Sequence, residues 1–178
     1  MQEINVLDKT FTLYISEADI EVSVKKIAGA INTDYEGKQP LFIAILNGSF
    51  MFAAELFKWL TIPAEISFIK LASYKGTTSS GHVITSIGLD AEIKDRHVII
   101  LEDILDTGKT LHSFLPQLYN MSPASLKIAA LLHKPDATIY DVPLHYNGIN
   151  IPDKFVVGFG LDYNGYGRNL PAIYQLKE

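Results

Sequence analysis

The segment VIILEDILDTGKTL, residues 98–111, places a run of apolar residues directly before an acidic pair, a third carboxylate and a Thr-Gly-Lys-Thr turn. A continuous apolar run of this kind is typical of a strand that is buried on both faces, as in a parallel sheet covered by helices. Ligands of such sheets bind beyond the carboxyl ends of the strands. The loop from Glu102 to Thr110 is therefore predicted to lie at a ligand-binding edge.

Strand and helix patterns alternate along the rest of the chain. Strands are predicted at 11–16, 40–46, 64–72, 82–89, 97–102, 125–133 and 154–161. Helices are predicted at about 17–32, around 53–60 and at about 107–119, the first of them after a Ser16 cap. This repetition favours an α/β fold in one domain over residues 1–178, with a mostly parallel twisted sheet flanked by helices.

The bulk composition narrows the class of function. The net charge of −5 provides no basic surface for binding along a nucleic-acid backbone, so a nucleic-acid partner is not expected. The absence of cysteine excludes disulfides, zinc–thiolate sites and thiol catalysis. The N-terminal residues lack the layout of a signal peptide, and no apolar run is long enough to span a bilayer. A soluble, cytoplasmic protein without a membrane partner is expected.

The two halves of the 102–110 loop suit different parts of one ligand. Backbone N–H groups at Asp106, Thr107, Gly108, Lys109 and Thr110 are predicted to wrap a phosphate at a helix N-terminus. Carboxylates cannot serve phosphate oxygens directly but accept hydrogen bonds from hydroxyl groups. A ribose 5-phosphate fits this division, with its 2- and 3-hydroxyls donating to the preceding acidic pair. The loop is not a Walker A motif, which would need glycine in place of Asp103.

The segment 98–111 resembles the 5-phosphoribosyl 1-pyrophosphate (PRPP) signature of the type I phosphoribosyltransferases, and the hypoxanthine-guanine branch is the best match. Four further segments resemble that branch in the same order, over about residues 41–170: ILNGSFMFAAEL, SYKGTTSSG, LLHKPD and IPDKFVVGFGLDYNGYGR. The resemblance implies the type I fold, with a small hood formed from the chain-terminal segments. It also implies transfer of a phosphoribosyl group from PRPP to a purine, with magnesium as cofactor.

The resemblance assigns the purine-binding roles. Asp106 is the candidate general base at purine N7, in addition to its place in the phosphate loop. Lys134 is expected to read the 6-oxo group, because an ammonium group can only donate hydrogen bonds. Phe155 is expected to stack on the base and Val156 to meet its hydrogen-bonding edge through the backbone.

The resemblance also assigns the groups around the pyrophosphate and the sugar. Asn47, Gly48 and Arg168 are expected to bind pyrophosphate, although many relatives have a basic residue in place of Asn47. The family often has a cis peptide bond immediately before that position. The remaining expected residues are the lid pair Ser73 and Tyr74, the ribose-binding pair Glu102 and Asp103, and a magnesium site formed by Asp162 with that same pair.

The expected reaction converts hypoxanthine, and also guanine, with PRPP into IMP or GMP and pyrophosphate, as in purine salvage. A homodimer or homotetramer is expected from the resemblance. Three alternatives stay open from the residues: a regulatory protein that keeps the PRPP fold and binds RNA, a phosphate-accepting receiver domain, and a phosphoribosyltransferase that prefers xanthine. The acidic net charge counts against RNA binding, and the acidic pair lies past the midpoint of the chain, unlike that of a receiver.

Overall fold

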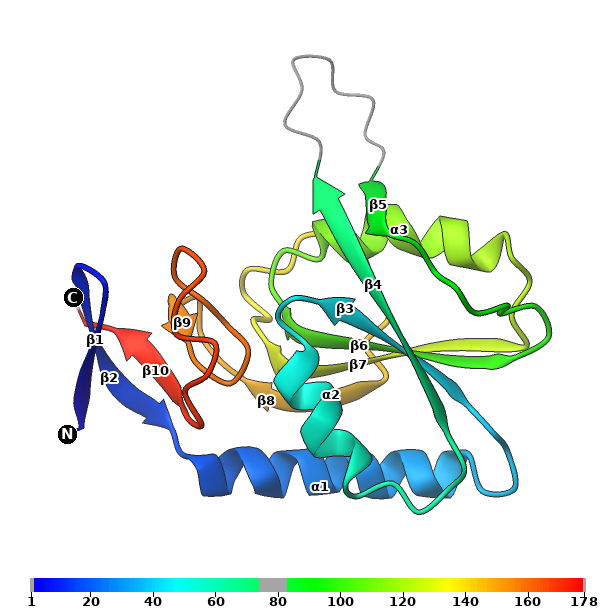
Figure 1. The fold of residues 1–178 in the computed structure, drawn as a ribbon, viewed down its shortest axis with the longest axis horizontal. Helices are drawn as coiled ribbons and strands as arrows, with labels where there is room; N and C mark the ends of the chain where they lie inside the picture. Colours follow the sequence, from blue (N-terminus) through cyan, green and yellow to red (C-terminus); the bar gives the residue numbers. More distant parts are fainter. Residues whose placement is uncertain (1, 74–82, 178) are drawn as a thin grey trace.

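The computed structural model describes residues 2–73 and 83–177 and contains two sheets (Figure 1). The larger sheet has the strand order β5-β4-β3-β6-β7-β8. Its strands are β3 (Leu41–Leu46), β4 (Glu65–Ser73), β5 (Val83–Ile87), β6 (His97–Leu105), β7 (Ser125–His133) and β8 (Tyr146–Asn150). All neighbouring strands pair in parallel except β4 and β5. The mostly parallel sheet predicted from the apolar runs is therefore confirmed.

Helices cover both faces of this sheet. Helices α1 (Glu17–Asp34) and α2 (Phe50–Phe57) pack with alternate strand residues such as Phe42 and Leu101 in one core. Helix α3 (Lys109–Tyr119) packs with the intervening residues, such as Ile43 and Ile100, in a second core. Each central strand thus buries both its faces, which explains why its sequence is continuously apolar.

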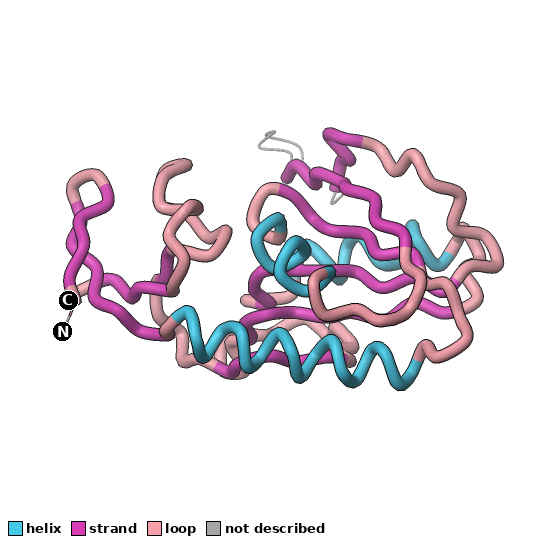
Figure 2. Tube along the Cα trace, turned by 60° about the horizontal axis from the view of Figure 1, so that its bottom comes forward, coloured by secondary structure: helices cyan, strands magenta, loops and turns pink. Residues whose placement is uncertain are grey.

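Helix α1 begins where the sequence predicts. The Oγ of Ser16 accepts a hydrogen bond from the Asp19 N–H at 3.2 Å, which satisfies one of the free N–H groups of the first turn. Ile20, Val24 and Ile27 are among the buried residues of the helix and share its inner face. The helix extends from the small sheet along one face of the large sheet (Figure 2). No helix in the described ranges has the length and apolarity that a bilayer crossing requires.

The smaller sheet forms the expected hood from both ends of the chain (Figure 1). Its order is β1-β2-β10-β9, and its strands are antiparallel. They are β1 (Glu3–Val6), β2 (Lys9–Ile15), β9 (Val156–Val157) and β10 (Ile173–Leu176). Phe11 and Tyr174 lie in its core. The strands β1, β8 and β10 were not predicted from the sequence.

The predicted strand over 154–161 is wrong in extent. Only Val156–Val157 is a strand, because Gly158, Phe159 and Gly160 have φ angles of 101°, 47° and 100° and fold the chain into a turn. The strand predicted to end at residue 102 continues instead to Leu105, so the acidic pair lies within β6. Helix α3 consequently begins at Lys109, two residues later than predicted.

Candidate active site

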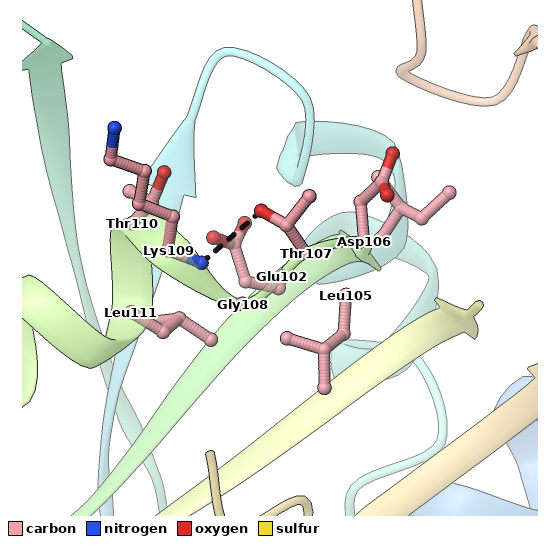
Figure 3. Close-up of a pocket in the computed structure, with 9 residues that line it drawn as sticks. Glu102, Leu105, Asp106, Thr107, Gly108, Lys109, Thr110 and Leu111 are labelled. Carbon is pink, nitrogen blue, oxygen red and sulfur yellow. Dashed lines mark hydrogen bonds between the residues drawn. The ribbon is translucent and has the colours of Figure 1, made fainter. Parts of the chain in front are cut away.

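The end of β6, the loop after it and the first turn of α3 line a cavity of about 90 Å³, formed by residues 102 and 104–111 (Figure 3). Gly108 has a φ of 83°, and an added Cβ would lie 3.1 Å from the carbonyl oxygen of Tyr140 and 3.2 Å from Val142, so glycine suits this turn. The Lys109 N–H donates to Thr107 Oγ1 at 3.3 Å. Helix α3 starts here, and the free N–H groups of its first turn make an anion site. The residues predicted to bind the 5-phosphate thus lie together in one cavity wall.

Lys134 and Asp106 meet beside this loop. They follow the adjacent parallel strands β7 and β6, and the Lys134 N–H donates to Leu105 O at 2.9 Å. The side chain of Lys134 is 8% exposed, and its Nζ lies 3.1 Å from Asp106 Oδ2. A second carboxylate, Oδ1 of Asp153, lies 3.1 Å from the same Nζ. The structure therefore joins two of the residues predicted to bind the purine and adds an aspartate that was not predicted.

The turn after β7 joins the segments that are predicted to bind the base and the 5-phosphate. Thr138 Oγ1 lies 2.7 Å from the carbonyl oxygen of Asp106 and 2.9 Å from that of Lys134. The N–H groups of Ile139 and Tyr140 both donate to Thr107 O at 3.1 Å. Thr138 was also missed from the sequence, because its contact with Asp106 spans 32 residues and depends on the tertiary fold.

The loop after β3 packs directly on Asp103 of the acidic pair. Leu46 and Asn47 are joined by the cis peptide bond that the resemblance suggested. A Cβ added to Gly48 would overlap the carboxylate of Asp103, so these two residues are in close contact. A Cβ on Gly160 would overlap the carbonyl oxygen of Gly48, so the turn after β9 closes on the same loop. The predicted pyrophosphate and ribose segments are thus neighbours.

Arg168 and Asp162 are bound to each other beside this contact. Arg168 Nη2 lies 2.7 Å from Asp162 Oδ1, and Nη1 donates to Gly160 O at 2.6 Å. The other oxygen of Asp162 accepts the Gly165 N–H at 2.6 Å. The charges of Arg168 and Asp162 both act on Asp103. The residues expected to bind pyrophosphate and magnesium therefore share one polar cluster.

Burial changes the acid strength of the acidic pair. It raises the pKa of Asp103 to about 6, although the Ile104 N–H, which donates to its Oδ1 at 2.8 Å, opposes this shift. Burial and the neighbouring Asp103 charge raise the pKa of Glu102 well above its ordinary value of 4.5. The pair is therefore poorly solvated when charged and suits hydroxyl groups or a cation as partners.

These shifts predict a pH-dependent effect of Asp103→Asn on stability. The folded pKa of Asp103 lies above its ordinary 3.8, so ionised Asp103 costs stability above about pH 6, and the cost disappears as the pH falls towards 3.8. The variant should unfold with a free energy about 1–3 kcal/mol higher than wild type at pH 8 and equal to it near pH 4. Urea titrations without ligands measure this difference. A difference that grows on acidification would contradict the assignment.

Phe155 presents its ring at the rim of the small sheet. The side chain is 46% exposed, and its ring centroid lies 6.0 Å from that of Tyr163, at an interplanar angle of 88°. The ring of Phe11 packs behind it, with centroids 6.3 Å apart. Val156 is buried, and its backbone pairs with Gln175 in the small sheet. An exposed ring that is supported from behind has the form expected of a stacking residue.

The remaining predicted residues lie at the carboxyl ends of strands of the large sheet or outside the described residues. Asn47 is exposed directly after β3, and Ser73 is the last residue of β4. Tyr74, the second lid residue, falls outside the described residues. Within 2–73 and 83–177, no group of three or more His, Asp or Glu residues is arranged to hold a metal ion. Magnesium commonly takes only one or two carboxylates and completes its shell with ligand phosphates and water.

The class of protein is given by the match of a phosphoribosyl transferase domain to residues 16–164. The chain belongs to the phosphoribosyltransferase family. The hypoxanthine-guanine phosphoribosyltransferase of Lactococcus lactis is 42% identical over 173 residues, which are 96% of this chain and 94% of that protein. The hypoxanthine-guanine-xanthine phosphoribosyltransferase of Tritrichomonas foetus is 36% identical over 179 residues, which are 100% and 98% of the two chains.

A solved structure has the same fold. The crystal structure of a hypoxanthine-guanine phosphoribosyltransferase from Bacillus anthracis, with a HEPES molecule in its active site, superposes with a TM-score of 0.88 and 38% identity. The match covers 93% of this chain and 98% of that chain. The type I fold and the membership of the family are therefore confirmed, and the comparisons give no support to the receiver-domain or RNA-binding interpretations.

Proposed function

We propose that the chain transfers the 5-phosphoribosyl group of PRPP to N9 of hypoxanthine or guanine, and so forms IMP or GMP and pyrophosphate in purine salvage. The observation that carries this proposal is the buried Lys134 ammonium beside the phosphate loop. An ammonium group donates hydrogen bonds and accepts none, so it favours the 6-oxo group of these bases and rejects the 6-amino group of adenine. The names of the relatives support the same choice.

Each part of the substrate has a matching group, either at the carboxyl edge of the large sheet or in the segment of the small sheet around β9. The 5-phosphate binds the N–H groups of the 106–110 loop, and the ribose hydroxyls donate to Glu102 and Asp103. The pyrophosphate binds the loop of Asn47 and Gly48 together with Arg168. The base stacks on Phe155 and meets the backbone of Val156.

The chemical step is a displacement at C1 of the ribose with inversion. Bond breaking to pyrophosphate runs ahead of attack by purine N9, so positive charge builds up on the sugar near the acidic pair. Asp106 accepts a hydrogen bond from purine N7–H and takes up that proton as the base reacts. As the lid pair, Ser73 and Tyr74 would exclude water, which would otherwise attack the electron-deficient carbon.

Magnesium is the proposed cofactor, because the donor set consists of carboxylate oxygens, which hard cations prefer. Asp162 and the pair Glu102–Asp103 would hold it, either directly or through water. When bound, magnesium neutralises charge on the pyrophosphate. Asp162 and Arg168 are joined by a 2.7 Å ion pair, and both keep further capacity, because a carboxylate has about four acceptor positions and a guanidinium has five N–H donors.

The domain organisation, oligomeric state and location of the protein are proposed from its likeness to the family. Residues 1–178 form a single phosphoribosyltransferase domain, and a homodimer or homotetramer is expected in the cytoplasm. Light scattering of the purified protein measures the oligomeric state, and a monomer over the working concentration range would contradict this part of the proposal.

The direct test is an assay with PRPP and magnesium in which hypoxanthine, guanine, xanthine and adenine are offered separately, each repeated with the metal chelated. Metal-dependent conversion of hypoxanthine and guanine, with adenine inert, is the expected result. Conversion of xanthine would extend the range to that of the Tritrichomonas foetus relative, since xanthine also carries a 6-oxo group. Adenine as the preferred base would contradict the role of Lys134. No turnover of any base, with PRPP still bound, would favour a regulatory protein.

A further inference from the structure

Asp153 shares the ammonium group of Lys134 with the proposed general base. Its Oδ1 lies 3.1 Å from Lys134 Nζ, the same distance as Oδ2 of Asp106. The side chain of Lys134 is 8% exposed, whereas that of Asp153 is 69% exposed. The cation is therefore enclosed along its length and held at its end by two carboxylates from different segments.

The backbone explains why Asp153 reaches this point. Strand β8 pairs in parallel with β7, and the pairing continues one residue past the end of β8, where the N–H of the buried Ile151 donates to the carbonyl of His133, the last residue of β7, at 2.8 Å. Pro152 follows, and the Lys154 N–H donates to its carbonyl at 2.7 Å, which turns the chain. Asp153 is thus fixed beside the residue that follows β7, which is Lys134.

The donor count at Lys134 leaves one position open. An ammonium group has three N–H donors, and the described residues supply two acceptors, one from Asp106 and one from Asp153. A buried donor without an acceptor costs free energy, so the third N–H favours a ligand oxygen. Two fixed carboxylates also fix the direction of the third N–H, because the three donors keep a tetrahedral arrangement.

We propose that Asp153 is a positioning residue for recognition of 6-oxopurines, an inference that rests on the proposed function. It holds the Lys134 ammonium so that the remaining N–H meets the 6-oxo oxygen. Its importance increases during the reaction, because Asp106 loses its negative charge when it takes up the proton from the base. Asp153 then remains as the anion that keeps Lys134 in place.

The test compares Asp153→Ala and Asp153→Asn with wild type and with Asp136→Ala, a matched control at an exposed aspartate two residues from Lys134. Asp153→Ala should raise KM for hypoxanthine, and Kd for IMP measured by calorimetry, by about fivefold, as expected for a partly exposed charge-assisted hydrogen bond. KM for PRPP should stay unchanged. Asp153→Asn should recover part of the loss, because its amide oxygen still accepts, and Asp136→Ala should match wild type.

The outcomes distinguish the positioning role of Asp153 from the proposed function. If wild type binds IMP but Asp153→Ala leaves KM for hypoxanthine and Kd for IMP unchanged, the positioning role is wrong and the proposed function stands. An equal rise in both KM values, without recovery in Asp153→Asn, would indicate general disruption and would also overturn the role. Wild type that binds IMP without forming it would contradict the proposed function, while the IMP affinities would still test Asp153. Wild type that does not bind IMP would overturn both.

Discussion

Asp106→Asn should lower kcat for IMP formation by about 10²–10⁴-fold, which is the usual contribution of a general base. The amide cannot take up the purine proton, but its oxygen can still accept the hydrogen bond from Lys134, which lies 3.1 Å from Asp106 Oδ2. The backbone of the phosphate loop is untouched, because Thr138 binds the carbonyl oxygen of residue 106 rather than its side chain. KM for PRPP should therefore stay within about twofold of wild type.

Steady-state kinetics with both substrates varied measures this split between kcat and KM. Asp136→Asn is the control, since it makes the same chemical change at an exposed aspartate close to Lys134. A normal kcat in Asp106→Asn would remove Asp106 from the role of general base. A large rise in KM for PRPP with unchanged kcat would assign it to phosphate binding alone.

Among the proposed substitutions, Gly160→Ala should lower the stability of the fold most. Gly160 has a φ of 100°, and its Cβ would overlap the carbonyl oxygen of Gly48, a backbone atom that cannot rotate away. The left-handed backbone and the overlap together should lower the free energy of unfolding by about 3–5 kcal/mol. Chemical denaturation measures this loss as a shift of the midpoint.

Substitutions at two other glycines distinguish the contribution of the left-handed backbone from that of the steric overlap. Gly37 has a φ of 72° with nothing within 4 Å of an added Cβ, so Gly37→Ala should cost only the backbone strain of about 1–2 kcal/mol. In Gly48→Ala the added Cβ meets the carboxylate of Asp103, a side chain that can rotate. This variant should lose PRPP affinity more than stability. Equal destabilisation by all three substitutions would contradict the close packing of the two loops.

The central strands could be predicted because burial on both faces leaves a continuous apolar run, as in Leu41–Leu46. The prediction failed where an apolar run contains glycines. In residues 154–161, Gly158 and Gly160 take left-handed conformations that the turn requires, although the hydropathy pattern fits a strand. Strand β8, with the sequence YNGIN, has neither an apolar run nor clear alternation and could not be found by pattern.

The grouping of candidate site residues could be predicted where they follow strand ends. Asp106 and Lys134 come directly after β6 and β7, and adjacent parallel strands bring such residues together. Asp153 could not be found in this way, because its position depends on the pairing of β8 and on a turn at Pro152. Its contact with Lys134 spans 19 residues and reflects the tertiary fold alone.

The most direct test of the central claim is a crystal structure of the protein with IMP. The account predicts the 5′-phosphate in the 106–110 cavity and purine O6 within hydrogen-bonding distance of Lys134 Nζ, which would still contact Asp106 and Asp153. IMP bound with its phosphate elsewhere, or with O6 away from Lys134, would contradict the assignment of this edge as a 6-oxopurine nucleotide site.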